Sequence, residues 1–119
     1  MNKRSTIFNH RDANPVPKLD SPWPGTVLLG NPQTVTLNGY ESEDGTILMG
    51  TWISTPGTWA IDYNDWEYCH ILEGRCVITP DGGDSIELKA NDVFIIEPGL
   101  KGTWKVCETI RKYYIFKLK

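Results

Sequence analysis

The sequence predicts an all-β domain, built as a sandwich or a barrel. From residue 26 onward, about ten short runs rich in β-branched and aromatic residues alternate with segments rich in Gly, Pro, Asn and Asp. This alternation is typical of short strands joined by tight turns. No run has a convincing helical period and no internal repeat is visible, so helical, α/β and repeat folds are disfavoured.

The predicted strands follow one another closely along the chain. Gly74, between two strands, predicts a tight turn or a bulge, and the segment PDGGD at 80–84 predicts a hairpin tip. The ten predicted strands cover residues 26–30, 33–37, 46–54, 58–63, 67–73, 75–79, 85–88, 92–96, 103–106 and 111–118.

Residues 1–25 differ from the rest of the chain. They are polar and contain four prolines, which remove backbone donors and favour extended conformations. We therefore expect an N-terminal arm at 1–25, with Ile7, Phe8 and Trp23 available for burial, and a barrel domain at 26–119. Such an arm could cover an exposed sheet edge of a second copy, so we expect a homodimer.

Size, charge and cysteine content limit the function classes. The 119 residues and 13.5 kDa fit one domain, and the net charge of -3 comes with scattered lysines and arginines. Lys101 and Lys105 flank Trp104, but this arrangement is typical of a solvated hairpin rather than a base-stacking platform. We therefore expect no nucleic-acid partner.

Three cysteines are an odd number and lack a disulfide framework, which indicates reduced thiols and a cytoplasmic protein. The N-terminus has no apolar segment of signal-sequence length, and no run reaches the roughly 18 apolar residues of a membrane span. We expect no membrane association.

Two motifs carry a family resemblance. In EYCHILEG, Glu67 is followed after six residues by Gly74, and NDVFIIEPGLKGTW follows at 91–104. Over roughly 50–116 this resembles the cupins, especially the branch of ethanolamine-utilisation cupins and ureidoglycine aminohydrolases, which share the segments seen here as EPGLKGTW and RKYY. The resemblance implies a single-domain RmlC-like cupin jelly-roll β-barrel with an extended N-terminal arm, and a homodimer.

The family's motifs imply a metal held by three histidines and a glutamate, but this chain has only two histidines. One lies in the arm, and His70 lies on the strand face opposite Glu67. We therefore expect no metal of the usual kind and no cofactor. The three histidine positions hold Ile61 and Tyr63, or with a longer spacer Ala60 and Asp62, and then Gly102.

One unusual metal site stays open at this point. Glu67 and Cys69 share a strand face, and Asp62 could join them. Carboxylate and thiolate prefer metals of different hardness, which disfavours this site.

The inward faces of the barrel supply the candidate site residues. The resemblance places Glu67 inside, as a general acid or base with Tyr63 as its hydrogen-bond partner, or as a residue that only shapes the cavity. Aromatic walls around one carboxylate suit an organic ligand with an amine or hydroxyls. The competing interpretation is that the tryptophans are core residues, which is their usual role in a small barrel, and that Cys69 is a buried, inert thiol. The ligand-binding candidates are Trp52, Trp59, Cys69, Trp104 and Tyr114.

Three hypotheses about function follow. The first is a metal-free small-molecule-binding cupin, accessory to amine, amino-acid or sugar catabolism. The second is a metal-independent isomerase or hydrolase that uses Glu67 and Tyr63. The third is a degenerate cupin that serves as an assembly module. Ureidoglycine aminohydrolase activity is disfavoured, because family members with that activity are built from two cupin domains and hold a metal.

Overall fold

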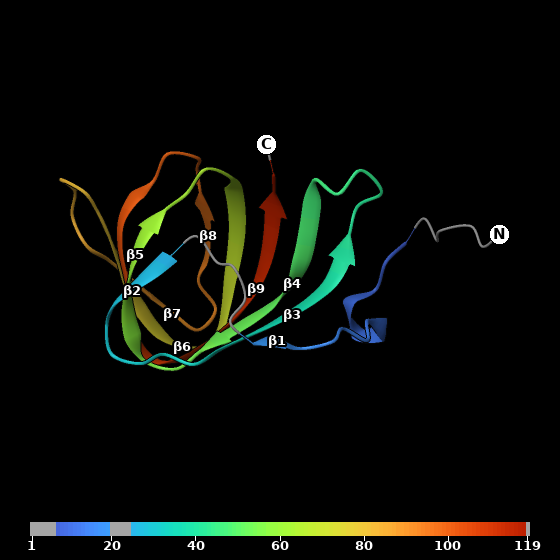
Figure 1. Ribbon diagram of the computed structural model, residues 1–119, viewed down its shortest axis with the longest axis horizontal. Coiled ribbons are helices and arrows are strands. Elements are labelled where there is room, and N and C mark those ends of the chain that lie inside the picture. Colours follow the sequence, from blue (N-terminus) through green and yellow to red (C-terminus); the bar gives the residue numbers. More distant parts are fainter. Residues whose placement is uncertain (1–6, 20–24, 119) are drawn as a thin grey trace.

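The computed structural model describes residues 7–19 and 25–118, which are almost entirely β-strand (Figure 1). Within these residues the helical content is the short 3₁₀ helix η1, His10–Asp12, and no helix is long and apolar enough to cross a membrane. The strands are β1 (Lys18–Leu19), β2 (Gly25–Leu29), β3 (Thr34–Glu41), β4 (Ile47–Ser54), β5 (Gly57–Asp62), β6 (Trp66–Pro80), β7 (Ile86–Lys89), β8 (Val93–Ile96) and β9 (Lys101–Lys117).

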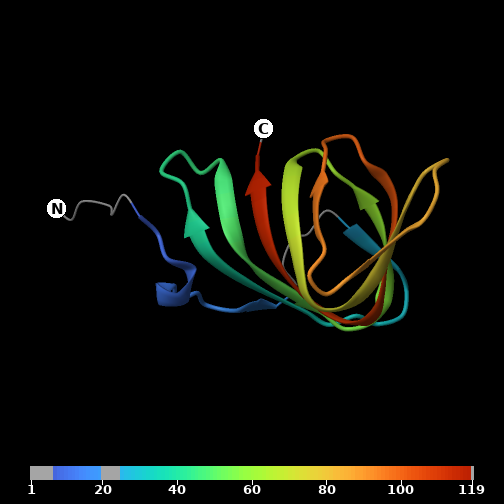
Figure 2. The ribbon, with the colours of Figure 1, turned by 180° about the vertical axis from the view of Figure 1, so that it is seen from behind.

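The strands form one antiparallel sheet that curls on itself into an open-ended barrel (Figures 1 and 2). Its main path runs β1-β3-β4-β9-β5-β2, and β6 pairs with β7, β8 and β9. The first part of β6 pairs with β8 and the last part of β9, whereas its second part pairs with β7 and the first part of β9. The two long strands therefore belong to both walls of the barrel, and the predicted all-β jelly-roll architecture is confirmed.

We name the two walls by their strands. The first layer contains β1, β3, β4, the second half of β9, the first half of β6, and β8. The second layer contains β2, β5, the first half of β9, the second half of β6, and β7.

The structure corrects the prediction of ten separate strands. Segments 67–73 and 75–79 are one strand, β6, and segments 103–106 and 111–118 are one strand, β9. Gly74 lies within β6 at a series of register shifts and has a φ of 87°. It is thus a bulge, one of the two predicted possibilities, and a bulge bends a strand without ending it. The hairpin tip predicted at PDGGD is present between β6 and β7.

The core lies between the two layers and is filled by alternate residues of the strands. The three cysteines, Cys69, Cys76 and Cys107, are free thiols. The buried apolar side chains are Trp52, Trp59, Ile61, Tyr63, Cys69, Ile71, Cys76, Ile78, Leu88, Ile96, Trp104, Val106, Ile110 and Tyr114.

The Gly74 bulge gives a first prediction. A Cβ at Gly74 would meet the backbone of Thr109 and Glu108, and the positive φ is unfavourable for any L side chain. Gly74→Ala should therefore lower the free energy of unfolding by roughly 3 kcal/mol in urea denaturation. Gly82→Ala is the matched control, because Gly82 also has a positive φ but its Cβ would meet no atom within 4 Å. That control should lose only about 1 kcal/mol, and equal losses would show that the bulge is not tightly packed.

Candidate functional site

Glu67 lies at the start of β6 with its side chain inside the barrel and no exposed surface. Its backbone partners are Ile96 of β8 and Phe116 of β9, and this register fixes the face on which its carboxylate lies. The hydroxyl of Tyr63 donates to Glu67 Oε1 at 2.7 Å, and both side chains are fully buried. The contact that the sequence predicted between these two residues is present.

The other carboxylate oxygen is held by a residue that sequence reasoning missed. Lys112 of β9 is fully buried, and its Nζ donates to Glu67 Oε2 at 2.9 Å. Strand alternation could have located it, because Tyr114 was expected to face inward and Lys112 is two residues before it on the same strand. A lysine is rarely fully buried unless it is paired. From the sequence alone, Lys112 would therefore be expected to face solvent.

Two tryptophans enclose the Lys112 ammonium. Nζ lies 4.5 Å from the ring centroid of Trp104 and 5.1 Å from that of Trp52, within the range of a cation–π interaction. The two indoles are themselves in edge contact, with centroids 6.3 Å apart. Aromatic walls with one carboxylate were expected to suit an amine ligand, and the amine between them here is the chain's own lysine.

Cys69 completes the immediate surroundings of the ammonium, with its Sγ 3.7 Å from Lys112 Nζ. Burial raises the pKa of the Cys69 thiol well above its ordinary value, so this sulfur is a neutral thiol near neutral pH. Burial disfavours the charged form of Lys112, but attraction from the Glu67 carboxylate and the hydrogen bond to it outweigh that penalty and raise the pKa of Lys112. The ammonium is therefore charged, and the raised pKa of Cys69 disfavours the thiolate that a nucleophile needs.

The remaining candidates also lie inside the barrel. Trp59 packs on Trp52 with ring centroids 6.3 Å apart. The Tyr114 hydroxyl donates to Asn38 Oδ1 at 2.8 Å, and burial raises the pKa of this tyrosine. The structure thus brings together all seven predicted site residues, each less than a tenth exposed. Their catalytic and ligand-binding roles stay predictions, because this cluster is closed to solvent.

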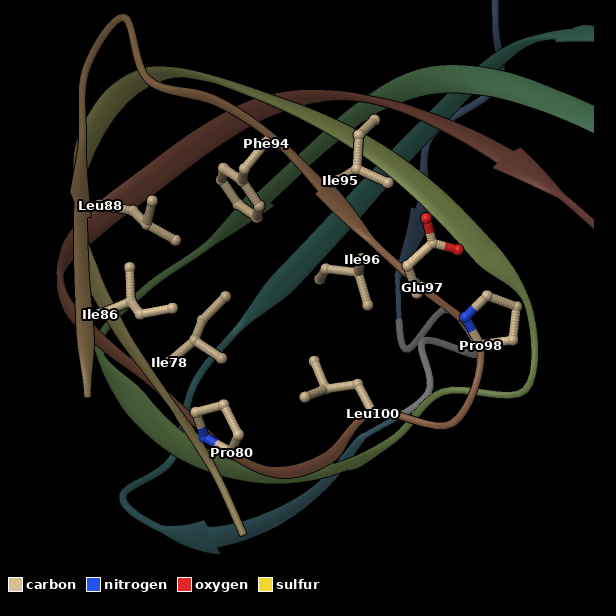
Figure 3. Close-up of a pocket in the computed structure, with 10 residues that line it drawn as sticks. All are labelled: Ile78, Pro80, Ile86, Leu88, Phe94, Ile95, Ile96, Glu97, Pro98 and Leu100. Carbon is tan, nitrogen blue, oxygen red and sulfur yellow. The ribbon is translucent and has the colours of Figure 1, made fainter. Parts of the chain in front are cut away.

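An apolar pocket of about 360 Å³ opens beside the buried cluster, between β6, β7, β8 and the loop that precedes β9 (Figure 3). Phe94 contacts the ring of Trp104, and Ile96 is the strand partner of Glu67, so these two side chains separate the pocket from the cluster. Among the described residues that line the pocket, Glu97 is the only charged one. The pocket is lined by Ile78, Pro80, Ile86, Leu88, Phe94, Ile95, Ile96, Glu97, Pro98 and Leu100.

Comparison of the sequence with models of known protein families identifies the family of this chain. The family model of the EutQ-like cupin domain matches residues 41–114, which is more than half of the chain. The chain belongs to the EutQ-like cupin family. No curated protein matches this cupin.

Solved structures share the cupin fold. A protein of unknown function of the DUF861 family from Pseudomonas syringae pv. tomato has a TM-score of 0.75 at 24% identity, over 86% of this chain and 44% of the other. This cupin therefore spans less than half the length of that protein. The EutQ protein of Clostridium difficile has a TM-score of 0.63 at 17% identity, over 73% and 69% of the two chains. A DUF861-family protein from Thermotoga maritima has a TM-score of 0.52 at 31% identity, over 54% and 73%.

The residues of this cupin do not fit the three-histidine metal site that the motifs imply. Among residues 7–19 and 25–118, no group of three or more His, Cys, Asp or Glu side chains could hold a metal ion. A cation beside Glu67 would also meet the Lys112 ammonium 2.9 Å away. The alternative site with Asp62 is wrong, because Asp62 is exposed while its neighbours Ile61 and Tyr63 are buried.

The buried pair gives a second prediction. Removing one partner leaves an unpaired charge in the core and typically lowers the free energy of unfolding by about 3–5 kcal/mol. Removing both partners leaves no unpaired charge. Glu67→Gln and Lys112→Met should each be strongly destabilising, and the double variant should lose much less than the sum of the two. A double-mutant cycle by urea denaturation measures this coupling. Lys105→Met, at an exposed position of the same strand, is the control and should change stability by less than about 0.5 kcal/mol. Additive losses would contradict the pairing.

The buried thiols give a third prediction. Burial raises the pKa of Cys76 from its ordinary value of 9.0 to about 12. Burial also raises the pKa of Cys69 well above its ordinary value. The folded chain therefore keeps protons that the unfolded chain releases above about pH 9, so the free energy of unfolding should fall as the pH rises from 9 toward 12. Between pH 7 and pH 9.5 the loss should be roughly 1 kcal/mol for each thiol.

Cys76→Ala tests this origin, with stability measured under reducing conditions at both pH values. The variant should be less stable at pH 7 but should lose less stability on going to pH 9.5. If the free energy of unfolding falls by the same amount between the two pH values in the variant and in the unaltered protein, Cys76 does not cause the loss.

Proposed function

We propose that this chain is a small-molecule-binding cupin-domain protein that works without the family's usual metal-binding histidines. The observation that carries the proposal is the apolar pocket of about 360 Å³ at the open side of the barrel. That volume lies within the range of small-molecule sites, which are concave, mostly apolar and supplied with few polar groups. The free thiols support a reducing, cytoplasmic setting.

The lining favours one class of ligand. Nine of its ten residues are apolar or proline, so a polyhydroxylated sugar would lose hydration there without gaining partners. Glu97 is exposed at the rim, where a carboxylate attracts a cationic head group. The ligand we propose has an apolar body and a basic amine, which agrees with an accessory role in amine catabolism.

The enzyme alternative, with Glu67 and Tyr63 as catalytic residues, has less support. One oxygen of Glu67 accepts from Tyr63 and the other from Lys112, and none of these side chains is exposed. A general acid or base must come within hydrogen-bond reach of a substrate proton. Phe94 and Ile96 stand between this group and the pocket, so catalysis would need both to move.

The assembly-module alternative is favoured by the filled interior of the barrel. Trp52, Trp104 and the Lys112–Glu67 pair occupy the space in which a cupin would hold its metal and substrate, and all four are buried. The assembly-module hypothesis requires no ligand in the pocket, whereas the binding hypothesis requires one. A ligand-binding experiment therefore separates the two.

A thermal-shift series with n-hexylamine, hexan-1-ol and hexanoate tests the pocket. We expect hexylamine to raise Tm most, because it combines the apolar chain with a charge opposite to that of Glu97. Ile86→Lys should abolish the shift, since Ile86 lines the pocket and is 52% exposed. Val27→Lys is the matched control, because Val27 is 42% exposed on β2 and lines neither this pocket nor the buried cluster.

Glu97→Gln should reduce the preference for hexylamine over hexanoate while leaving the shift by hexan-1-ol. The absence of any shift with all three probes would reject the binding function and favour the assembly module. Equal losses in Ile86→Lys and Val27→Lys would show that binding occurs elsewhere.

A further inference from the structure

The strand β9 bends on the outside of the barrel, where it passes from the second layer to the first. It pairs with β5 up to Val106 and with β4 from Ile110 onward. Its pairing with β6 shifts register at the same place, between Arg75 and Cys76, and passes over Cys107. Cys107 is therefore the extra residue of a bulge, and bulges bend strands and re-aim side chains, often next to active sites.

A hollow of about 630 Å³ lies at this bend. The end of β2, the start of β5, the second half of β6 and the middle of β9 surround it. Its volume is within the range of small-molecule sites. None of the described residues lines both this hollow and the apolar pocket beside β7 and β8, so the two are separate. We call it the outer hollow, and its lining includes Leu29, Pro56, Thr58, Arg75, Lys105 and Cys107.

Two cations line the outer hollow, and among the described residues of its lining none is acidic. Strand alternation directs Arg75 and Lys105 outward, because Cys76 and Trp104 beside them are buried. Lys105 is the register partner of Val77, so Arg75 lies diagonal to it on the same face. Diagonal neighbours on two antiparallel strands have Cβ atoms roughly 7–8 Å apart, a span that two long side chains can close around one anion.

Neither cation is neutralised by a carboxylate within residues 7–19 and 25–118, where both salt bridges involve other residues. The carboxylate best placed to neutralise Arg75 is that of Glu108, its register partner on β9. No salt bridge joins these two described residues, and Glu108 does not line the outer hollow. The chain has a net charge of -3, so two uncompensated cations at one hollow mark a local site of attraction for anions.

We propose that the outer hollow binds a small organic phosphate, as a second site beyond the amine pocket. A phosphate monoester carries a charge of about -1.5 to -2 near neutral pH, which matches two cations, whereas a monocarboxylate would leave one unpaired. The Arg75 guanidinium can donate two parallel hydrogen bonds to phosphate oxygens, and the Lys105 ammonium adds a point charge. Thr58, the register partner of Lys105 on β5, supplies a hydroxyl donor beside them.

The rest of the lining favours a phosphate that carries an organic group. Leu29 on β2 is 68% exposed, and Pro56 and Val77 add further apolar surface. A ligand body that covers this surface gains the free energy of removing it from water, whereas inorganic phosphate leaves it exposed. The outer hollow and the amine pocket therefore have opposite preferences for charge, since Glu97 lies at the rim of the second.

Isothermal titration calorimetry with phenyl phosphate, inorganic phosphate and succinate tests the site. We expect phenyl phosphate to bind most tightly, because it combines the phosphate charge with an apolar ring. Arg75→Met and Lys105→Met should each raise the Kd of phenyl phosphate by about 10-fold or more, as expected for the loss of a charge-assisted hydrogen bond. Arg75→Lys keeps the charge but loses the two parallel donors, so it should weaken binding less than Arg75→Met.

Lys101→Met is the matched control, because Lys101 is an exposed lysine of the same strand that does not line the outer hollow. It lies four residues from Lys105, roughly 14 Å along the strand, beyond the screening length of about 8 Å at physiological ionic strength. The Kd should therefore change by less than about 2-fold, and circular dichroism should show that all variants fold.

Four results would overturn the proposal. They are no binding of phenyl phosphate, binding that survives both Arg75→Met and Lys105→Met, equal weakening by Lys101→Met, and succinate or inorganic phosphate binding as tightly as phenyl phosphate. Hexylamine should not compete with phenyl phosphate, because none of the described residues lines both sites. Loss of the amine function would therefore leave this proposal standing, and the reverse also holds.

Discussion

The ion pair between Lys112 and Glu67 is the constraint on which the interior of this barrel depends. Two charges without exposed surface require partners for their polar atoms, and the structure supplies them from three strands and from the residue after β5. Tyr63 directly follows β5, whereas Glu67 and Cys69 come from β6, Trp52 from β4, and Lys112 with Trp104 from β9. A one-residue slip of any of these strands would turn its member of the cluster outward, so the pair also specifies the register.

The same pair changes what this cupin does with the centre of its fold. In relatives that follow the family motifs, a cation is expected beside the glutamate, held by histidines. Here the positive charge beside Glu67 is an ammonium attached to the chain, and two indole rings complete its surroundings. The apolar pocket lies to one side of this group, toward β7 and β8. The same fold can therefore hold either a metal or a buried ion pair at its centre.

Sequence reasoning predicted the fold because period-two patterns, turn residues and the Glu67-to-Gly74 spacing all agree. It also placed Glu67 beside Tyr63, since the spacing and strand alternation together fix a face. It missed Lys112, because a lysine is usually solvated and only its contacts reveal that it is paired. It divided β6 at Gly74, because a glycine between two apolar runs indicates a turn as readily as a bulge.

The sharing of β6 and β9 between both layers has a consequence for how this chain can fold. Neither wall closes without β9, which pairs with β4, β5 and β6 and lies at the C-terminal end of the sequence. During synthesis, the interior face of every earlier strand must therefore wait, uncovered, until residues 101–117 have left the ribosome. A barrel that depends on its last strand closes only once that strand is available, and until then its exposed nascent strands are open to chaperones.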